Sequence, residues 1–242
     1  MAIRVAVAGA LGRMGAVACA ALRAAEGIEY VGGLVRTLPE GGPADTLFDS
    51  ADKLFEKQKP DVLLDLTTYP ATVEISMAAL RRGVRPVIGA TGWSDFDRQA
   101  LEREAGERGL GAMLVPNFSI GAELAMRFAG EAARFYPSVE IVELHHDKKK
   151  DRPSGTAIAT AERIVASGDF GEVPIHSVRL RGLVAHQEVL FGGEGEVLTI
   201  RHDCLSREAY AAGMLAAVHA VMNANALIVG LGDVVPEAKP ST

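Results

Sequence analysis

Apolar residues in the first half of the chain alternate between short continuous runs and helical spacing. The first run ends at a glycine-rich turn, Gly9 to Gly15, after which apolar residues recur every three or four positions until Gly27. Such alternation predicts parallel strands connected by helices, as in a doubly wound sheet. The predicted strands cover 3–8, 28–35, 61–66, 86–88 and 111–115, with a loop over 37–50. Helices are predicted after the first, third and fourth strands, and Ser94 and Asp97 are spaced as a capping box for the last of them.

The pattern changes beyond residue 117, where strands outnumber helices. Helices are predicted over 121–135 and 156–166, and strands over 139–145, 176–181, 184–191 and 197–202. Gly192-Gly193-Glu194-Gly195 predicts a hairpin between the last two strands. This half therefore predicts a separate α+β unit with a mixed or antiparallel sheet. A final helix from Ser206 is long enough to return and pack on the first unit.

Composition and charge exclude several classes of partner. The chain has 242 residues, of which 48% are hydrophobic, and a formal net charge of −6, so we expect no bulk attraction to nucleic acid or to an anionic membrane. The first strand follows the N-terminus without a basic or long apolar leader, and no apolar run is long enough to span a bilayer. We therefore expect a cytoplasmic protein, with Cys19 and Cys204 as buried thiols rather than a disulfide.

The turn after the first strand has the spacing G-x-x-G-x-x-G, with glycines at 9, 12 and 15. Glycines at such a turn let the backbone approach a pyrophosphate, and the N-terminus of the helix that follows favours negative charge. Glycine-rich turns also serve purely structural purposes. Because a strand precedes this turn and a helix follows it, we predict that it binds a dinucleotide.

The end of the second predicted strand bears on which nicotinamide cofactor is used. Sheets that bind NAD commonly have an acidic residue there for the ribose hydroxyls, whereas this chain has Val35 followed by Arg36. Arg36 could contact a 2′-phosphate, or it could be a solvated arginine at a strand end. We therefore predict that NADPH is used at least as well as NADH, and the use of both cofactors stays open.

Chemically reactive side chains are densest in one stretch of the second half. There an apolar strand runs into His145 and His146, lysines at 148–150 and the helix start Pro153-Ser154-Gly155-Thr156. The free N–H groups of a helix start, together with lysines, favour a carboxylate or a phosphate. The alternative is a solvated cationic loop beside two structural histidines. Because neighbouring strand residues point to opposite faces, we do not expect the histidines to chelate a metal together.

The order of groups from 145 to 156, H-H-x-x-K-x-D-x-P-S-G-T, resembles the signature of the dihydrodipicolinate reductase family, also called 4-hydroxy-tetrahydrodipicolinate reductases. Further stretches similar to that family run from one end of the chain to the other. They are Gly9–Gly15, Asp65–Thr67, Gly89–Gly92, Pro116–Ser119 and Leu183–Val189. Val35 is a departure, because many members carry an acidic residue at that position.

The resemblance implies a fold, an assembly and an activity. It implies a Rossmann-type dinucleotide-binding domain over 1–116, a substrate-binding and oligomerisation α+β domain over 117–205, and a C-terminal helix and tail over 206–242 that returns to the first domain. It further implies a homotetramer that converts a small cyclic dicarboxylate, 4-hydroxy-tetrahydrodipicolinate, into tetrahydrodipicolinate in diaminopimelate and lysine biosynthesis. Water is lost and NADPH or NADH donates a hydride.

The resemblance also implies residue roles. His145 or Lys149 would supply the proton that balances hydride addition, and Lys149 with His146, Ser154, Gly155 and Thr156 would hold the carboxylates. The implied cofactor residues are Gly9, Leu11, Gly12, Arg13, Met14, Gly15, Arg36, Gly89, Ala90, Thr91, Pro116, Asn117 and Phe118. We expect no metal.

Two other functions stay open at this point. One is another nicotinamide-dependent dehydrogenase of similar two-domain plan, such as an aspartate or homoserine dehydrogenase. The other is a non-catalytic nucleotide sensor, in which residues 145–156 would be only a surface loop. Oxidation of NADPH in the presence of the hydroxy-tetrahydrodipicolinate separates these functions from the reductase.

Overall fold

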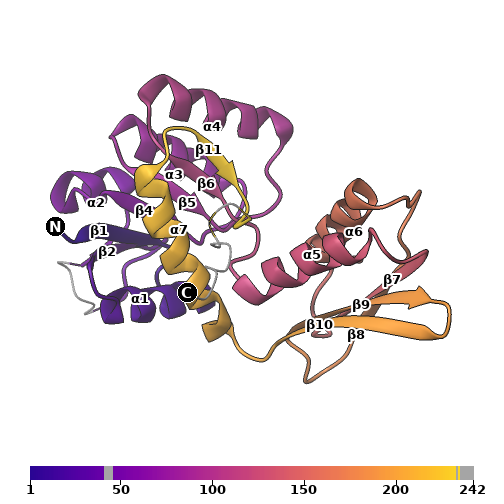
Figure 1. Ribbon diagram of the computed structural model, residues 1–242. Helices are drawn as coiled ribbons and strands as arrows, with labels where there is room; N and C mark the ends of the chain where they lie inside the picture. The colour runs from indigo at the N-terminus through magenta and orange to yellow at the C-terminus, as the bar shows by residue number, and fades with distance from the viewer. Residues whose placement is uncertain (41–45, 233, 235–242) are drawn as a thin grey trace. The chain divides into compact units, whose positions relative to one another are not determined.

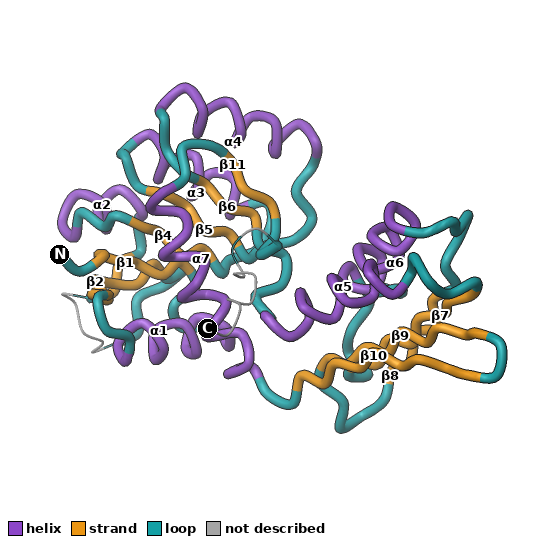
Figure 2. The backbone as a smooth tube through the Cα atoms, in the orientation of Figure 1, coloured by secondary structure: helices purple, strands orange, loops and turns teal. Residues whose placement is uncertain are grey.

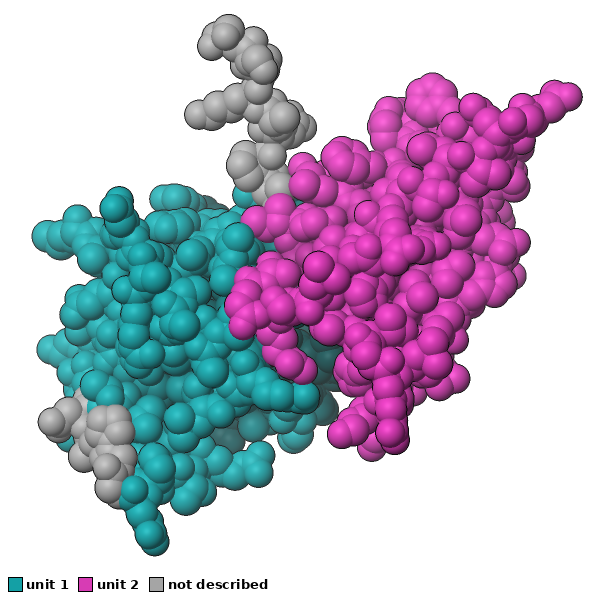
Figure 3. Space-filling view, turned by 90° about the horizontal axis from the view of Figure 1, so that it is seen from below, with its two compact units in different colours: residues 1–118, 210–242 teal, residues 119–209 magenta. Residues whose placement is uncertain are grey.

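The computed structural model describes residues 1–40, 46–232 and 234. The chain forms two compact units, which Figure 3 shows in separate colours. The first consists of Met1–Phe118 with Tyr210–Thr242, and the second of Ser119–Ala209. Figures 1 and 2 show a parallel sheet flanked by helices in the first unit and a smaller sheet with two helices in the second.

The first unit is built on a seven-stranded sheet in which the pairings between described strands are parallel. Its strands are β1 (Ile3–Ala8), β2 (Ile28–Leu34), β3 (Leu47–Phe48), β4 (Val62–Asp65), β5 (Arg85–Ile88), β6 (Ala112–Leu114) and β11 (Leu227–Val229). They follow the order β11-β6-β5-β4-β1-β2-β3, with Val5 opposite Val62 in the centre. Residues 5–8 of β1 and 62–64 of β4 are continuous apolar runs because both faces of the sheet are covered there.

Helices cover both faces of this sheet. α1 (Arg13–Ala24) and α7 (Ala211–Asn223) contact each other on one face, and α7 also contacts β4, β5 and β6. On the other face α3 packs between α2 and α4 (Figure 1). These three helices are α2 (Ala51–Gln58), α3 (Ala71–Arg81) and α4 (Asp95–Arg108).

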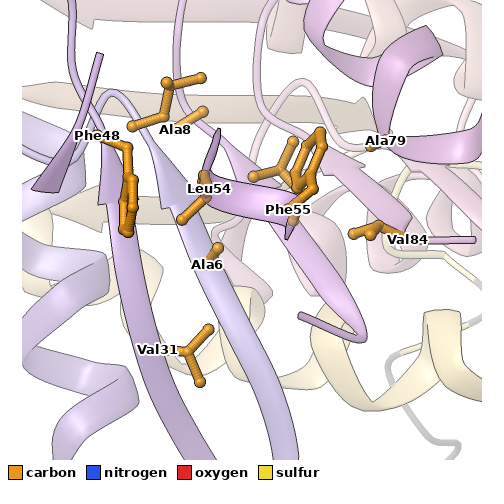
Figure 4. Packing of buried hydrophobic residues seen from close by; sticks show 10 residues of the cluster. Ala6, Ala8, Val31, Phe48, Leu54, Phe55, Ala79 and Val84 are labelled. Carbon is orange, nitrogen blue, oxygen red and sulfur yellow. The ribbon is translucent and has the colours of Figure 1, made fainter. Parts of the chain in front are cut away.

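A compact cluster of apolar side chains packs α2 against the sheet (Figure 4). Leu54 and Phe55 of α2 belong to one cluster with Ala6 and Ala8 of β1 and Phe48 of β3. Burial of a leucine or phenylalanine side chain contributes about 1.5–3 kcal/mol. The cluster therefore holds the start of α2 close to the end of β2, with which α2 is also in contact.

The structure contains short elements that the sequence pattern did not predict. α2, β3 and β11 have eight, two and three residues, and segments of that length carry too little periodicity to be told from loops. β3 lies inside the predicted loop 37–50, of which residues 41–45 lie outside the described part. The final helix also begins later than predicted, because a 3-10 turn over Arg207–Tyr210 precedes α7.

The second unit holds a four-stranded sheet with the order β10-β9-β7-β8. Its elements are β7 (Ser138–His145), β8 (Ile175–Arg179), β9 (Ala185–Gly193), β10 (Glu196–Cys204), α5 (Ile120–Ala132) and α6 (Gly155–Ser167). β7 is parallel to β8 and antiparallel to β9, and β9 turns back into β10 at Glu194-Gly195. The mixed sheet and the hairpin predicted from the sequence are thus confirmed, as is the predicted fold class.

The two faces of this second sheet differ. α5 and α6 cover one face, where Ile141, Val189 and Phe191 have no accessible surface. No described element of this unit covers the opposite face. The apolar residues of that face include the partly buried Val142, Leu144, Val178 and Leu190.

Candidate functional site

The sheet of the first unit has a topological switch point between β1 and β4. The chain passes from β1 to β2 on one side and later returns to β4 on the other side of β1. In sheets of this kind the carboxyl ends of the two central strands open a crevice that binds the ligand. The loops that follow β1, β4 and β5 contain several of the predicted cofactor residues.

The turn after β1 is tight because two of its glycines leave no room for a side chain. Gly9 has a φ of 77° and donates its N–H to the Leu34 carbonyl at 2.9 Å. A Cβ on Gly15 would lie 2.1 Å from the Gly9 carbonyl oxygen, so only glycine lets α1 begin so close to the end of β1. The remaining predicted residues of the turn are the exposed Leu11, Gly12 and Arg13 and the partly buried Met14.

A cavity of about 600 Å³ adjoins this turn. That volume lies within the range of about 300–1,000 Å³ typical of cofactor sites. Of the predicted cofactor residues, Gly9 and Arg36 line it. The other lining residues include Val35, Asp49, Ser50, Asp52, Thr67 and Glu74. The cavity is therefore bordered by the ends of β1, β2 and β4 and by the first turns of α2 and α3.

The charges in the cavity are mixed. Asp52 pairs with Arg82 at 2.8 Å, and Asp49 pairs with Lys53 at 3.3 Å. Arg36 has no ion-pair partner among the described residues and is exposed. The carboxylates were not predicted from the sequence, because the spacing along the chain does not indicate that the start of α2 lines the same cavity as Arg36.

Asp65 orders the loop after β4. Its Oδ1 accepts hydrogen bonds from the Thr67 N–H at 2.9 Å and the Thr67 hydroxyl at 2.5 Å, and its Oδ2 accepts from Thr72 at 2.9 Å and Ser76 at 3.4 Å. Burial raises the pKa of Asp65 above its ordinary value, although these hydrogen bonds oppose the shift. The network holds Thr67 and Thr68 at the wall of the cavity.

The loops after β5 and β6 meet at the ring of Phe118. A Cβ on Gly89 would lie 2.8 Å from that ring, and Gly89 donates its N–H to the Asp65 carbonyl at 2.8 Å. Phe118 itself is buried, so its ring packs under the loop. The other predicted residues here are the buried Ala90, the partly buried Asn117 and the exposed Thr91 and Pro116.

The second unit gathers the predicted catalytic residues at the end of β7. His145 is the last residue of the strand, and the loop that follows turns back through a hydrogen bond from the Lys149 N–H to the His146 carbonyl at 3.1 Å. The Lys149 ammonium group forms an ion pair with Asp151 at 2.7 Å. The positive charge of Lys149 contributes to lowering the pKa of His145, and both predicted residues lie where β7 passes into its following loop.

A buried pair that sequence analysis missed lies beside His145. Arg179 donates to both carboxylate oxygens of Glu143 at 2.8 and 2.7 Å, and the side chains are 2% and 0% exposed. Glu143 also forms a short hydrogen bond with Nδ1 of His145. The available signal was the acidic residue two positions before His145 on the same strand, since residues two apart in a strand share one face.

These contacts determine the charge states of the pair. Burial alone would raise the pKa of Glu143, but hydrogen bonds from Arg179, Ser177 and His145 outweigh it and leave that pKa below its ordinary value. Burial lowers the pKa of His145, with Lys149 and Arg179 adding to the effect and Glu143 opposing it. At neutral pH Glu143 is therefore ionised and His145 is mainly neutral.

The start of α6 is held firmly. Ser154 is buried, and its Oγ accepts a hydrogen bond from the Ala157 N–H at 3.2 Å, so this side chain caps the helix. Thr160 donates to the Thr156 carbonyl at 2.7 Å and accepts from Gln187 at 2.9 Å. The groups of this helix start that can bind an anion are therefore the backbone N–H groups of its first turn, which includes Gly155 and Thr156.

Two further kinds of feature are absent from the described ranges 1–40, 46–232 and 234. No group of three or more His, Cys, Asp and Glu residues there could hold a metal ion. None of the helices in these ranges combines the length and apolar character that a membrane crossing requires.

Family models match nearly the whole chain. The model for the N-terminus of dihydrodipicolinate reductase matches residues 3–118. The model for the C-terminus of dihydrodipicolinate reductase matches residues 121–235. The first of these models thus spans most of the predicted dinucleotide-binding part, and the second spans most of the predicted substrate-binding part and of the C-terminal part.

Individual proteins are similar over the same length. A 4-hydroxy-tetrahydrodipicolinate reductase from Halalkalibacterium halodurans is 43% identical over 96% of this chain and 99% of its own. A protein of the same name from Geobacillus kaustophilus is 42% identical, covering 96% and 98%. The solved structure of a dipicolinate-bound dihydrodipicolinate reductase from Paenisporosarcina sp. TG-14 matches with a TM-score of 0.86 and 38% identity, covering 97% of this chain and 100% of that chain.

Proposed function

The chain belongs to the dihydrodipicolinate reductase family, and from this premise we propose that it reduces 4-hydroxy-tetrahydrodipicolinate to tetrahydrodipicolinate with a nicotinamide cofactor. The protein is then an oxidoreductase of diaminopimelate and lysine biosynthesis. The observation that carries the proposal is the cluster of His145, Lys149 and the α6 start within a chain that matches the family along its whole length.

The proposed reaction has two parts. First the substrate loses its hydroxyl group and a ring hydrogen as water, which leaves a conjugated imine. A nicotinamide cofactor held by the first unit would supply a hydride to one end of the conjugated system, and His145 or Lys149 would supply the proton for the other end. The products are tetrahydrodipicolinate and the oxidised cofactor, so one hydride and one proton are consumed in each turnover.

Proton transfer is assigned to His145 and Lys149. Asp151 holds the Lys149 ammonium group in place through an ion pair at 2.7 Å. Glu143 holds His145 through a hydrogen bond with the Nδ1 atom of its imidazole ring. A positioned acid or base of this kind contributes about 10²–10⁴ in rate.

Charge and backbone donors in the second unit suit a dicarboxylate. Lys149 and His146 belong to one loop, and the first-turn N–H groups at Gly155 and Thr156 favour an anion. We assign the two carboxylates to these groups. Ser154 contributes indirectly, because it caps the helix that carries those N–H groups.

The first unit is assigned to the dinucleotide, with its pyrophosphate at the turn after β1 and its adenosine in the adjoining cavity. Arg36 is the cation of that cavity without an ion-pair partner among the described residues, whereas Asp49 and Asp52 are paired with Lys53 and Arg82. This arrangement supports the proposal that the protein uses NADPH at least as well as it uses NADH. The predicted nicotinamide-side loops at Gly89 and Phe118 lie in the same unit.

The second unit is assigned to substrate binding and to assembly of a homotetramer. No described element of the unit covers the outer face of its sheet, where Val142, Leu144 and Leu190 lie. A closed symmetric oligomer would cover such a face. The domain bounds and the cytoplasmic location expected from the sequence stay predictions.

The proposed function is tested by following NADPH oxidation with 4-hydroxy-tetrahydrodipicolinate made in situ. We expect turnover that depends on both compounds. An aspartate or homoserine dehydrogenase would turn over its own substrate instead, and a nucleotide sensor would bind NADPH without turnover of any of them. Either result would contradict the proposal.

A further inference from the structure

The carboxylate of Glu143 has hydrogen-bond donors on both oxygens. Oε1 accepts from Nη2 of Arg179 at 2.7 Å, while Oε2 accepts from Nη1 of Arg179 at 2.8 Å and contacts Nδ1 of His145. The Glu143 side chain has no accessible surface. An ionised carboxylate only accepts hydrogen bonds, so the nitrogen of His145 that faces it must carry the hydrogen.

This requirement gives the two nitrogens of the His145 ring different roles. With Nδ1–H directed at Glu143, the neutral ring has its lone pair on Nε2, and the protonated ring has its exchangeable proton there. The charged groups around the ring are Glu143 on β7, Arg179 on β8 and Lys149 on the following loop. On β9 the residue opposite His145 is the uncharged Ala185, and Glu143 is the carboxylate that contacts the ring.

Arg179 extends the same arrangement to the neighbouring loop. Besides Glu143, it donates to the backbone carbonyl of Asp151 at 2.6 Å. The Asp151 side chain in turn pairs with Lys149 at 2.7 Å. One buried guanidinium group therefore contacts the residue that orients His145 and the residue that holds Lys149.

We propose that Glu143 is a positioning residue that holds His145 in its Nδ1–H form. Nε2 of His145 is then the nitrogen that exchanges protons with the substrate. Arg179 keeps Glu143 and the Lys149 loop in place. The inference rests on the proposed function of this cluster. During turnover the Nδ1–H bond to Glu143 stays intact. The bond that forms or breaks is the one between Nε2 and the exchanged proton.

A simpler alternative is that Glu143 and Arg179 only brace the sheet. Removal of one partner from a buried ion pair destabilises a protein strongly in either case. Loss of stability alone therefore cannot separate the two roles. The state of the His145 ring can, because a structural brace would leave its tautomer and its titration unchanged.

The test is Glu143→Gln, studied by nitrogen-15 NMR of labelled histidines and by steady-state kinetics. The wild type should show His145 as the Nδ1–H tautomer, and the variant should lose that preference and titrate at lower pH, because the carboxylate that stabilises the imidazolium is gone. We expect kcat to fall about 10²-fold, the low end for a positioned acid or base, with the KM for NADPH unchanged.

Two further variants keep the test decisive. Glu140→Gln is the matched control, because Glu140 lies on the same strand and pairs with another histidine, His176, at 2.8 Å in an exposed position. It should leave His145 and kcat unchanged. If Glu143→Gln does not fold, the double variant Glu143→Gln with Arg179→Met removes both charges and leaves neither unpaired. It should show the same loss of the Nδ1–H tautomer.

The proposal is overturned if wild-type His145 is the Nε2–H tautomer, a measurement that needs no variant. It is also overturned if a folded Glu143 variant keeps the wild-type tautomer, or keeps kcat within about threefold against the 10²-fold loss expected. Absence of NADPH oxidation in the wild type, with the Nδ1–H tautomer present, would count against the proposed function alone. The two ideas therefore fail separately.

Discussion

At the scale of single residues, the lysine run beside His145 tests which cation acts on the substrate. Lys149 is partly buried and held by Asp151, whereas Lys148 is exposed. We expect Lys149→Ala to lower kcat/KM for the hydroxy-tetrahydrodipicolinate by about 10²–10⁴, as for loss of a positioned acid, and Lys148→Ala to stay near wild type. NADPH oxidation measures both. The opposite ranking would mean that the register of the motif has been misassigned.

Arg36 tests the cofactor preference. A hydrogen bond to a charged group contributes about 1.5–3 kcal/mol, and NADPH has a 2′-phosphate that NADH lacks. We therefore expect Arg36→Ala to reduce kcat/KM with NADPH while leaving that with NADH almost unchanged. Arg98→Ala is the control, because Arg98 is an exposed arginine on α4 paired with Asp95. A clear wild-type preference for NADH would contradict the prediction.

At the scale of elements, the start of α1 depends on Gly15. A Cβ at this position would lie 2.1 Å from the Gly9 carbonyl oxygen, so Gly15→Ala must displace α1 from the strand end. We expect a lower melting temperature and weaker NADPH binding. Gly106→Ala in α4 is the matched control, since nothing lies within 4 Å of a Cβ there. It should stabilise the protein by about 0.5–1 kcal/mol. Equal effects of the two substitutions would contradict the packing argument.

The start of α6 depends on its cap. Ser154→Ala removes the acceptor of the Ala157 N–H, which costs about 1 kcal/mol, and the loosened first turn should raise the KM for the dicarboxylate but not for NADPH. Ser94→Ala removes the corresponding cap of α4, where Ser94 accepts from the Asp97 N–H at 3.1 Å. That control should lower stability without changing the KM for the dicarboxylate. A shared kinetic effect would exclude a specific role of the α6 start.

At the scale of the whole molecule, the uncovered sheet face of the second unit predicts assembly. Leu190→Lys places a charge among the apolar residues of that face and should lower the mass measured by light scattering from the tetramer toward smaller species. Val165→Lys is the control, because Val165 is an exposed residue of α6, which packs against the other face of the sheet. A monomeric mass of the wild type at working concentration would contradict the prediction.

The alternation of apolar runs and helical spacing sufficed to predict the parallel sheet, the mixed second sheet and the hairpin at Glu194-Gly195. This was possible because burial on both faces of a strand, or on one face of a helix, leaves its period in the local sequence. The short α2, β3 and β11 leave no such period. The glycine turn and the order of groups from 145 to 156 likewise pointed to a dinucleotide and to an anionic substrate, because helix starts and glycine turns are local structures.

Tertiary structure alone decided which distant side chains meet. Glu143 and Arg179 are 36 positions apart, and they pair because β7 and β8 run parallel with His145 opposite Arg179. In the same way the start of α2 and the residues just before it bring Asp52 and Asp49 to the cavity that Arg36 lines. A contact of this kind depends on the register of strands and the packing of helices, which arise from interactions summed over the whole core. The sequence by itself determined the elements and the chemistry near His145, and the fold determined which groups control that chemistry.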